Sequence, residues 1–257
     1  MNELSKQVEK VSKIAKDRTT KQVINDLMQM FCNLITEPAF IEVAFPNTLY
    51  RYQAGFRQEL SYYKTDLPAW NELQTLSQMF MQAIKKSEPF TDVIGQLYDL
   101  ELVGNTMGQF LTPPDVADTL ASLTAPLMGE IDEPLTIGDM TGCGAGTLVL
   151  SQVKSILHTQ GRGAVRFLDV RALDLDMNMA KMATVQIVLN ACIHRIQIRS
   201  LIVHQGNAIT DYTAVNEGKK SIFEWMPNAP LAFYCQVHQA KKDIAEITGK
   251  LQELELI

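Results

Sequence analysis

The chain has 257 residues, of which 46% are hydrophobic and 20% are charged, and its formal net charge is -6. This length and composition predict a globular protein with a substantial core, arranged as one large domain or two small ones. The negative charge excludes a protein that holds nucleic acid through a broad basic surface of its own, so any contact with DNA must be local or supplied by a partner.

Signals for secretion, membrane insertion and metal binding are absent from the sequence. Residues 1–20 are charged and contain no apolar signal core, and no apolar run approaches the roughly 18 residues that a membrane span requires. We therefore expect a cytoplasmic protein with no membrane contact. Cys32, Cys143, Cys192 and Cys235 have no metal-binding spacing, so we expect reduced thiols and no metal site.

The first hundred residues predict a helical region. Apolar residues recur at three- and four-residue spacing over residues 2–35, which indicates two consecutive helices, and the same spacing returns over residues 71–86. Pro38 and Pro46 interrupt the pattern, and the aromatic residues that follow favour a core over a base-stacking platform. We predict a helical N-terminal region over residues 1–104 and a second domain over residues 105–257.

Beyond residue 105, short β-type runs alternate with helical ones, which is typical of an α/β sheet. The predicted strands cover residues 135–139, 170–174, 201–204 and 231–234. The predicted helices cover residues 147–158, 177–194 and 239–256, and the second of these is apolar on nearly all sides, as a buried helix should be.

The motif "LTIGDMTGCGAGTLVL" places Gly142, Gly144 and Gly146 on alternate positions after Asp139. A strand that passes through glycines into a helix presents backbone amides and a helix N-terminus at the carboxyl edge of a parallel sheet, where polar ligands bind. Glycine suits this place because it adopts positive φ cheaply and lets a ligand approach the backbone. The motif therefore predicts a cofactor-binding loop.

The spacing of the glycines helps to choose the cofactor. A dinucleotide fingerprint that starts at Gly142 would need a third glycine where Thr147 stands. Asp139 would repel a pyrophosphate, whereas a cationic sulfonium that carries an ammonium group would be attracted. The loop thus favours S-adenosylmethionine.

Two later strand ends supply further candidate contacts. Asp174 ends the second predicted strand, about where a carboxylate would accept the ribose hydroxyls. Asp176 and Met177 could line the adenine, and the amide of Asn207 could pair with an adenine edge. A strand-end aspartate is also commonly a helix cap, so both interpretations stay open.

With "GQFLTPPDVADTL" beside "IGDMTGCGAGTL", the chain resembles the N6-adenine DNA methyltransferases, especially the modification subunits of type I restriction systems and their phage or plasmid relatives. The resemblance covers roughly residues 90–210 and implies a Rossmann-like methyltransferase sheet that binds S-adenosylmethionine. It implies that the segment with Phe110, Thr112 and Pro113 closes over the methionine part of the cofactor. The family loop aligns with residues 139–146, which include Asp139, Thr141, Gly142 and Gly144.

The sequence departs from this family in its catalytic half. The family motif [ND]-P-P-[YF] is missing; the nearest string is "NAPL" at residues 228–231, which lies before an apolar run and not after it. Few residues remain after Cys235, so we expect an incomplete sheet, either in a fragment of a longer enzyme or in a reduced relative. No catalytic residue is assigned.

Three functions remain open from the sequence. The first is an adenine-N6 methyltransferase that reaches DNA with a partner or specificity subunit. The second is a non-catalytic module that binds S-adenosylmethionine or a partner, docking through its N-terminal helices or the 239–256 stripe to a specificity subunit, a host protein or a second copy of itself. The third is a nicotinamide-dependent dehydrogenase. Such an enzyme needs the third glycine of the dinucleotide fingerprint and a set of catalytic residues, and the sequence shows neither.

Overall fold

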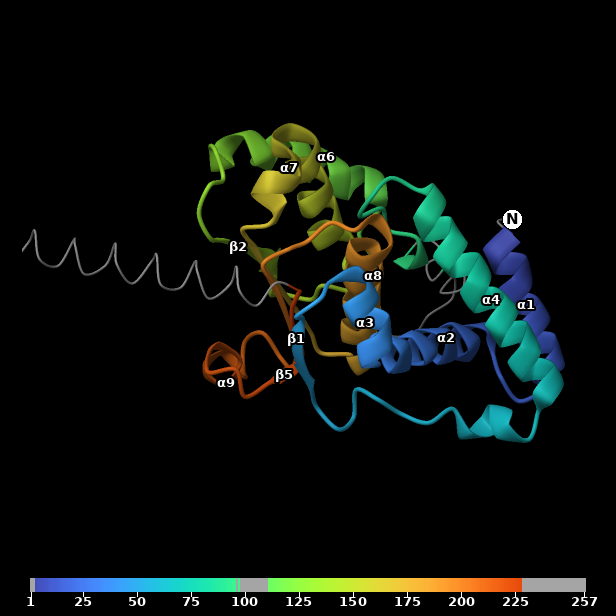
Figure 1. Cartoon of the computed structure of the whole chain (residues 1–257). Helices are drawn as coiled ribbons and strands as arrows, with labels where there is room; N and C mark the ends of the chain where they lie inside the picture. Colours follow the sequence, from blue (N-terminus) through green and yellow to red (C-terminus); the bar gives the residue numbers. More distant parts are fainter. Residues whose placement is uncertain (1–2, 96, 98–110, 228–257) are drawn as a thin grey trace, which may run out of the picture.

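The computed structural model describes residues 3–95, 97 and 111–227 (Figure 1). Phe110, the strand predicted at 231–234 and the helix predicted at 239–256 lie outside these residues. The described elements before the gap are α1 (Glu3–Ile14), α2 (Thr20–Leu34), α3 (Pro38–Ala44), β1 (Leu49–Tyr52), the 3-10 helix η1 (Ser61–Lys64) and α4 (Leu67–Lys86). After the gap they are α6 (Pro114–Thr124), the 3-10 helix η2 (Ala125–Met128), β2 (Leu135–Asp139), α7 (Thr147–Val165), β3 (Leu168–Asp174), α8 (Met177–His194), β4 (Ser200–Gln205), α9 (Tyr212–Asn216) and β5 (Ser221–Met226).

The described strands form one mixed sheet of five strands in the order β1-β5-β4-β3-β2. The strands β2, β3 and β4 are parallel, with α7 and α8 as their crossover connections. Strand β5 pairs antiparallel with β4, and β1 pairs antiparallel with β5. The prediction of an α/β fold is confirmed, as are the three strands predicted between residues 135 and 204, although β3 begins two residues earlier than predicted.

The expectation of a helical region over the first hundred residues is wrong at one place. Residues Leu49–Tyr52 form β1, the edge strand of the same sheet, and β1 pairs with β5. The guanidinium of Arg51 donates two hydrogen bonds of 2.6 Å to the Glu224 carboxylate across this pair. A strand of four residues is too short to show a periodicity of its own, so only its pairing with β5 defines it.

Helix α8 is the centre of the molecule. Every residue from Met179 to Cys192 is buried, because α2 and α4 cover one side of the helix and β3 and β4 cover the other (Figure 1). The prediction of a helix apolar on nearly all sides is confirmed, with identical bounds. The packing of α2 and α4 on α8 also means that the N-terminal region and the sheet share one hydrophobic core.

Helix α7 packs on β2 and β3, and α6 packs on α7. These helices and α8 fix the positions of the carboxyl ends of the parallel strands. No helix within residues 3–95, 97 and 111–227 is both long and apolar enough to cross a bilayer.

Candidate functional site

The turn between β2 and α7 has the conformation that its glycines require. The φ angles of Gly142, Gly144 and Gly146 are 142°, 54° and 92°, all in the region that favours glycine. We call residues Thr141–Gly146 the glycine loop. Because β2 is parallel to β3 and β4, this loop lies at the carboxyl edge of the sheet, where ligands of open α/β sheets bind.

Backbone hydrogen bonds to the end of β3 hold the glycine loop. The amide of Cys143 donates to the carbonyl of Leu173 at 2.8 Å, and the amide of Gly144 donates to the Asp174 carboxylate at 2.8 Å. Within the loop, the amide of Gly146 donates to the carbonyl of Cys143 at 2.8 Å. The neighbouring strand therefore positions the middle of the loop.

The three glycines face different surroundings. Among the residues that the structure describes, a Cβ on Gly142 would meet no atom within 4 Å, so no described group fills the space there. A Cβ on Gly144 would come within 2.7 Å of the Leu111 side chain, and one on Gly146 within 3.1 Å of Ala183. Gly142 thus leaves the backbone open to a ligand, whereas Gly144 and Gly146 allow close packing against the protein itself.

The carboxylate of Asp139 shapes the start of the glycine loop. Its Oδ1 atom accepts hydrogen bonds from the backbone amide of Thr141 at 3.0 Å and from the Thr141 hydroxyl at 2.9 Å. Among the residues that the structure describes, no group donates to its Oδ2 atom. The side chain is only partly buried, so this second oxygen is available for a cationic ligand.

The carboxylate of Asp174 is engaged by the protein on both oxygens. Its Oδ2 atom accepts from the amide of Gly144, and its Oδ1 atom accepts from the amide of Asp176, each at 2.8 Å. Burial raises the pKa of this carboxyl, although both amides act against the rise. Each oxygen retains one lone pair, so the ribose contact stays a prediction, and the visible role of Asp174 is to anchor the glycine loop.

Asp176 and Asn207 both serve as local caps. Asp176 Oδ1 accepts from the amide of Asn178 at 2.8 Å, which caps the start of α8. Asn207 Oδ1 accepts from the amides of Ile209 and Thr210 at 2.9 and 3.2 Å. The Asn207 side-chain NH2 is the group left for an adenine edge, and that contact stays a prediction.

The segment before α6 reaches the glycine loop. Leu111 lies against Gly144, and Thr112 and Pro113 follow directly, with Pro113 at the N-cap position of α6. Thr112 is partly buried and Pro113 is exposed. The structure therefore brings the "LTPP" segment next to the glycine loop, two motifs that are about 30 residues apart in the sequence.

Cys143 lies within the loop but is not suited to act as a nucleophile. Its side chain is buried, and burial, together with the nearby carboxylates of Asp174 and Asp139, raises the pKa of the thiol well above its ordinary value. The thiolate is the reactive form of cysteine, so Cys143 is a packed thiol here.

A set of buried polar residues that was not predicted from the sequence lies behind the glycine loop: Asp92, Thr147 and Gln186. A signal was present for one of them, because Gln186 is one of the few polar residues inside the mostly apolar run of α8. Asp92 gave no signal, since a single acid in a polar turn is ordinary.

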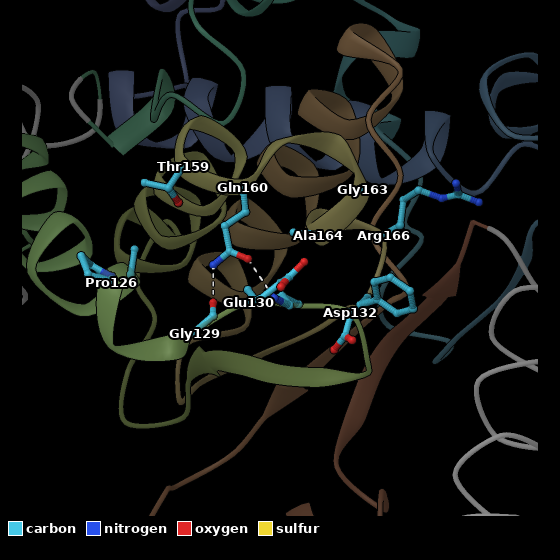
Figure 2. A pocket seen from close by; sticks show the side chains of 12 residues that line it. Pro126, Gly129, Glu130, Asp132, Thr159, Gln160, Gly163, Ala164 and Arg166 are labelled. Atoms are coloured by element: carbon cyan, nitrogen blue, oxygen red, sulfur yellow. Dashed lines mark hydrogen bonds between the residues drawn. The ribbon is translucent and has the colours of Figure 1, made fainter.

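A cavity of about 830 Å³ lies at the other edge of the sheet (Figure 2). It is formed by the residues that precede β2 and the end of α7, and Gln160 crosses it with hydrogen bonds to the Ile131 amide and the Gly129 carbonyl. In Figure 2 the Arg166 side chain extends away from Glu130 and Asp132. The cavity lies at the amino ends of β2 and β3, away from the glycine loop, and it is not the candidate site.

No protein-family model matches this chain, and no curated protein matches it significantly.

Proposed function

We propose that this protein binds S-adenosylmethionine at the glycine loop and is a Rossmann-like methyltransferase of the N6-adenine DNA type. The observation that carries the proposal is the combination of three glycines at positive φ, an acid at the end of β2 and the "LTPP" segment against Gly144. This set lies at one edge of the parallel strands, as a cofactor site in such a sheet should.

The residues present fit a cationic cofactor better than a dinucleotide. No atom of the described residues lies within 4 Å of a Cβ placed on Gly142, and a side chain there would take up space that a ligand could use. Asp139 offers a carboxylate oxygen beside this opening, which attracts an ammonium or sulfonium group and repels a pyrophosphate. The same repulsion disfavours a nicotinamide-dependent dehydrogenase, whose cofactor carries a pyrophosphate.

The bound cofactor would supply an activated methyl group. The role of the chain is then to bind and orient: Asp139 would face the cationic end, and the glycine loop would supply backbone contacts. Asp174 would hold the loop in place and use its remaining lone pairs for ribose hydroxyls. DNA would be reached together with a partner or specificity subunit, because the net charge of -6 supplies no broad basic surface.

A module that binds the cofactor without transferring a methyl group is the second candidate. Two observations favour it: β2 is the last strand of the sheet on its side in the described part of the chain, and no Asn/Asp-Pro-Pro-aromatic motif occurs in the sequence. Methyl transfer to adenine-containing DNA, with and without added specificity subunits, distinguishes the two candidates.

The first test is calorimetric titration of the full chain with S-adenosylmethionine, with NAD as the comparison ligand. We expect micromolar binding of S-adenosylmethionine and none of NAD. Asp139→Asn should weaken binding about 5- to 150-fold, because a charge-assisted contact contributes about 1–3 kcal/mol. Asp132→Asn is the matched control, since it makes the same charge change at an exposed site on the opposite edge. Equal affinities of the two variants, or no binding by the wild type, would refute the proposed site.

A further inference from the structure

A buried polar network lies directly behind the glycine loop. It consists of Asp92 from the turn after α4, Thr147 at the start of α7 and Gln186 in the middle of α8. All three side chains are almost completely inaccessible, with exposed fractions of 5%, 3% and 0%. Burying polar groups is unfavourable unless they are hydrogen-bonded, so each of these side chains needs partners inside the protein.

Asp92 accepts three hydrogen bonds. Its Oδ1 atom accepts from the amide of Gly95 at 2.7 Å and from the side-chain amide of Gln186 at 2.8 Å. Its Oδ2 atom accepts from the hydroxyl of Thr147 at 2.5 Å. Within the described residues no cation pairs with this carboxylate, and burial raises its pKa. The carboxylate is therefore held by hydrogen bonds alone, next to the first turn of α7.

Gln186 connects this carboxylate to the glycine loop. Its Nε2 atom donates both to Asp92 Oδ1 and to the backbone carbonyl of Ala145, each at 2.8 Å. Its Oε1 atom accepts from the amides of Val93 and Ile94 at 2.9 and 3.0 Å. One side chain thus joins the turn after α4 to the backbone of the loop.

The glycine loop is consequently held from two sides. On the β3 side, the Asp174 carboxylate accepts a hydrogen bond from the amide of Gly144. On the α8 side, the side-chain amide of Gln186 donates a hydrogen bond to the carbonyl of Ala145. Thr147, which Asp92 binds, follows Gly146 directly and starts α7. A loop with three glycines has high conformational freedom, so these fixed points determine how much ordering remains for a ligand to impose.

We propose that Asp92 and Gln186 are positioning residues that preorganise the glycine loop for its ligand, acting through Thr147 and the carbonyl of Ala145. The inference rests on the proposed function, because the ligand used to test it is S-adenosylmethionine. It assigns to the buried network a role in affinity that is separate from its contribution to stability.

Asn190 provides a matched comparison on the same helix. It lies one turn after Gln186 and is equally buried, with an exposed fraction of 0%. Its side chain accepts from the amide of Phe90 at 2.7 Å and donates to the carbonyl of Gln186 at 2.9 Å. Neither bond involves the glycine loop, so Asn190 shares the structural role of Gln186 without the contact to the site.

The experiment compares Gln186→Met with Asn190→Leu in the full chain. Both variants replace a buried amide with an apolar side chain of similar size, and both should lower the free energy of unfolding. We expect Gln186→Met to weaken binding of S-adenosylmethionine about 10-fold, because the loop loses one fixed point, and Asn190→Leu to leave the affinity within about 2-fold of the wild type. Equal effects of the two variants on affinity would overturn the inference.

A ligand-free measurement keeps this test independent of the proposed function. We expect hydrogen exchange at the amides of Cys143, Gly144 and Gly146 to be faster in Gln186→Met than in Asn190→Leu. Thr147→Val should produce the same change, and Thr147→Ser, which retains the hydroxyl that Asp92 binds, should restore slow exchange. If the variants show this exchange pattern but the wild type does not bind the cofactor, the proposed function alone is refuted. Unchanged exchange in Gln186→Met would refute the positioning role even if the cofactor binds.

Discussion

Two turns at the same edge of the sheet are built in opposite ways. The glycine loop after β2 is held by groups that are distant in sequence, namely Leu173, Asp174 and Gln186. The turn over Gly206–Asp211 after β4 is held mainly by its own residues, since Asn207 and Asp211 exchange hydrogen bonds through backbone and side chain.

This difference separates two sources of order. The turn after β4 is a local structure that a short polar sequence encodes, and one tertiary bond, from the amide of Gly206 to the carbonyl of Asp174, ties it to β3. The glycine loop acquires its shape only when β3 and α8 are in place. A ligand loop of this kind can be precise without being locally stable, because its rigidity comes from the surrounding fold.

The largest effect on stability should follow from Gly146→Ala, which disrupts the tertiary packing of the glycine loop. The substitution places a Cβ at a φ of 92° and within 3.2 Å of the Ala183 backbone. We expect the free energy of unfolding to fall by about 3 kcal/mol, because strain at such a φ costs about 1–3 kcal/mol and overpacking costs a similar amount. Chemical denaturation measures the change.

Gly163→Ala is the control for Gly146→Ala. Gly163 lies in α7, and a Cβ there would meet no atom of the described part of the chain within 4 Å. This variant should be about 0.5–1 kcal/mol more stable than the wild type, since alanine restricts the unfolded chain and favours a helix. A loss of stability in both variants would show that α7, and not the loop packing, is the sensitive element.

A smaller effect should follow from Asn207→Ala, which attacks the local turn. The alanine cannot accept hydrogen bonds from the amides of Ile209 and Thr210, and the free energy of unfolding should fall by about 1 kcal/mol. Asn178→Ala, at an exposed position of α8, should change stability by less than about 0.5 kcal/mol. Faster hydrogen exchange in the glycine loop of Asn207→Ala would contradict the independence of the two turns.

The smallest expected effect is the change of stability at acidic pH, and its sign should differ between Asp174 at the glycine loop and Asp211 in the turn after β4. Burial raises the pKa of Asp174 above its ordinary value of 3.8, so its ionised form is less stable in the folded chain, and stability should rise as pH falls from the folded pKa to 3.8. The amide of Asn207 lowers the pKa of Asp211, so that stabilisation is present above 3.8 and is lost as pH falls through the lower, folded pKa. Titration of the carboxyl carbon resonances should show Asp174 protonating before Asp211; the reverse order would contradict these assignments.

The candidate site was partly predictable because its strongest signals are local. Glycine adopts positive φ more readily than other residues, so the three glycines of the loop predict this conformation. The structure gives positive φ at Gly142, Gly144 and Gly146. The alternative uses of Asp176 and Asn207 as caps were also foreseeable, because short polar side chains at strand ends bind nearby amides.

The predicted parallel strands and α8 follow from hydrophobic runs long enough to show their own pattern. By contrast, β1 and β5 escaped prediction. The edge strand β1 has only four residues and gains its stability from pairing, and pairing between residues 49 and 226 has no local signature. Strand β5 lies between β1 and β4, so its place in the sheet also depends on residues that are distant in sequence.

The sequence by itself determined the α/β class, the position of the glycine loop and the buried character of α8, because each depends on residues that are close together along the chain. The tertiary structure alone decided that a strand from the N-terminal region joins the sheet and that Asp92 reaches Thr147 and Gln186, which are 55 and 94 residues away. The physical reason is that a hydrogen bond between distant residues is encoded by neither partner. It forms because the apolar surfaces of α4, α7 and α8 pack in one arrangement and leave the buried polar groups no water to bind.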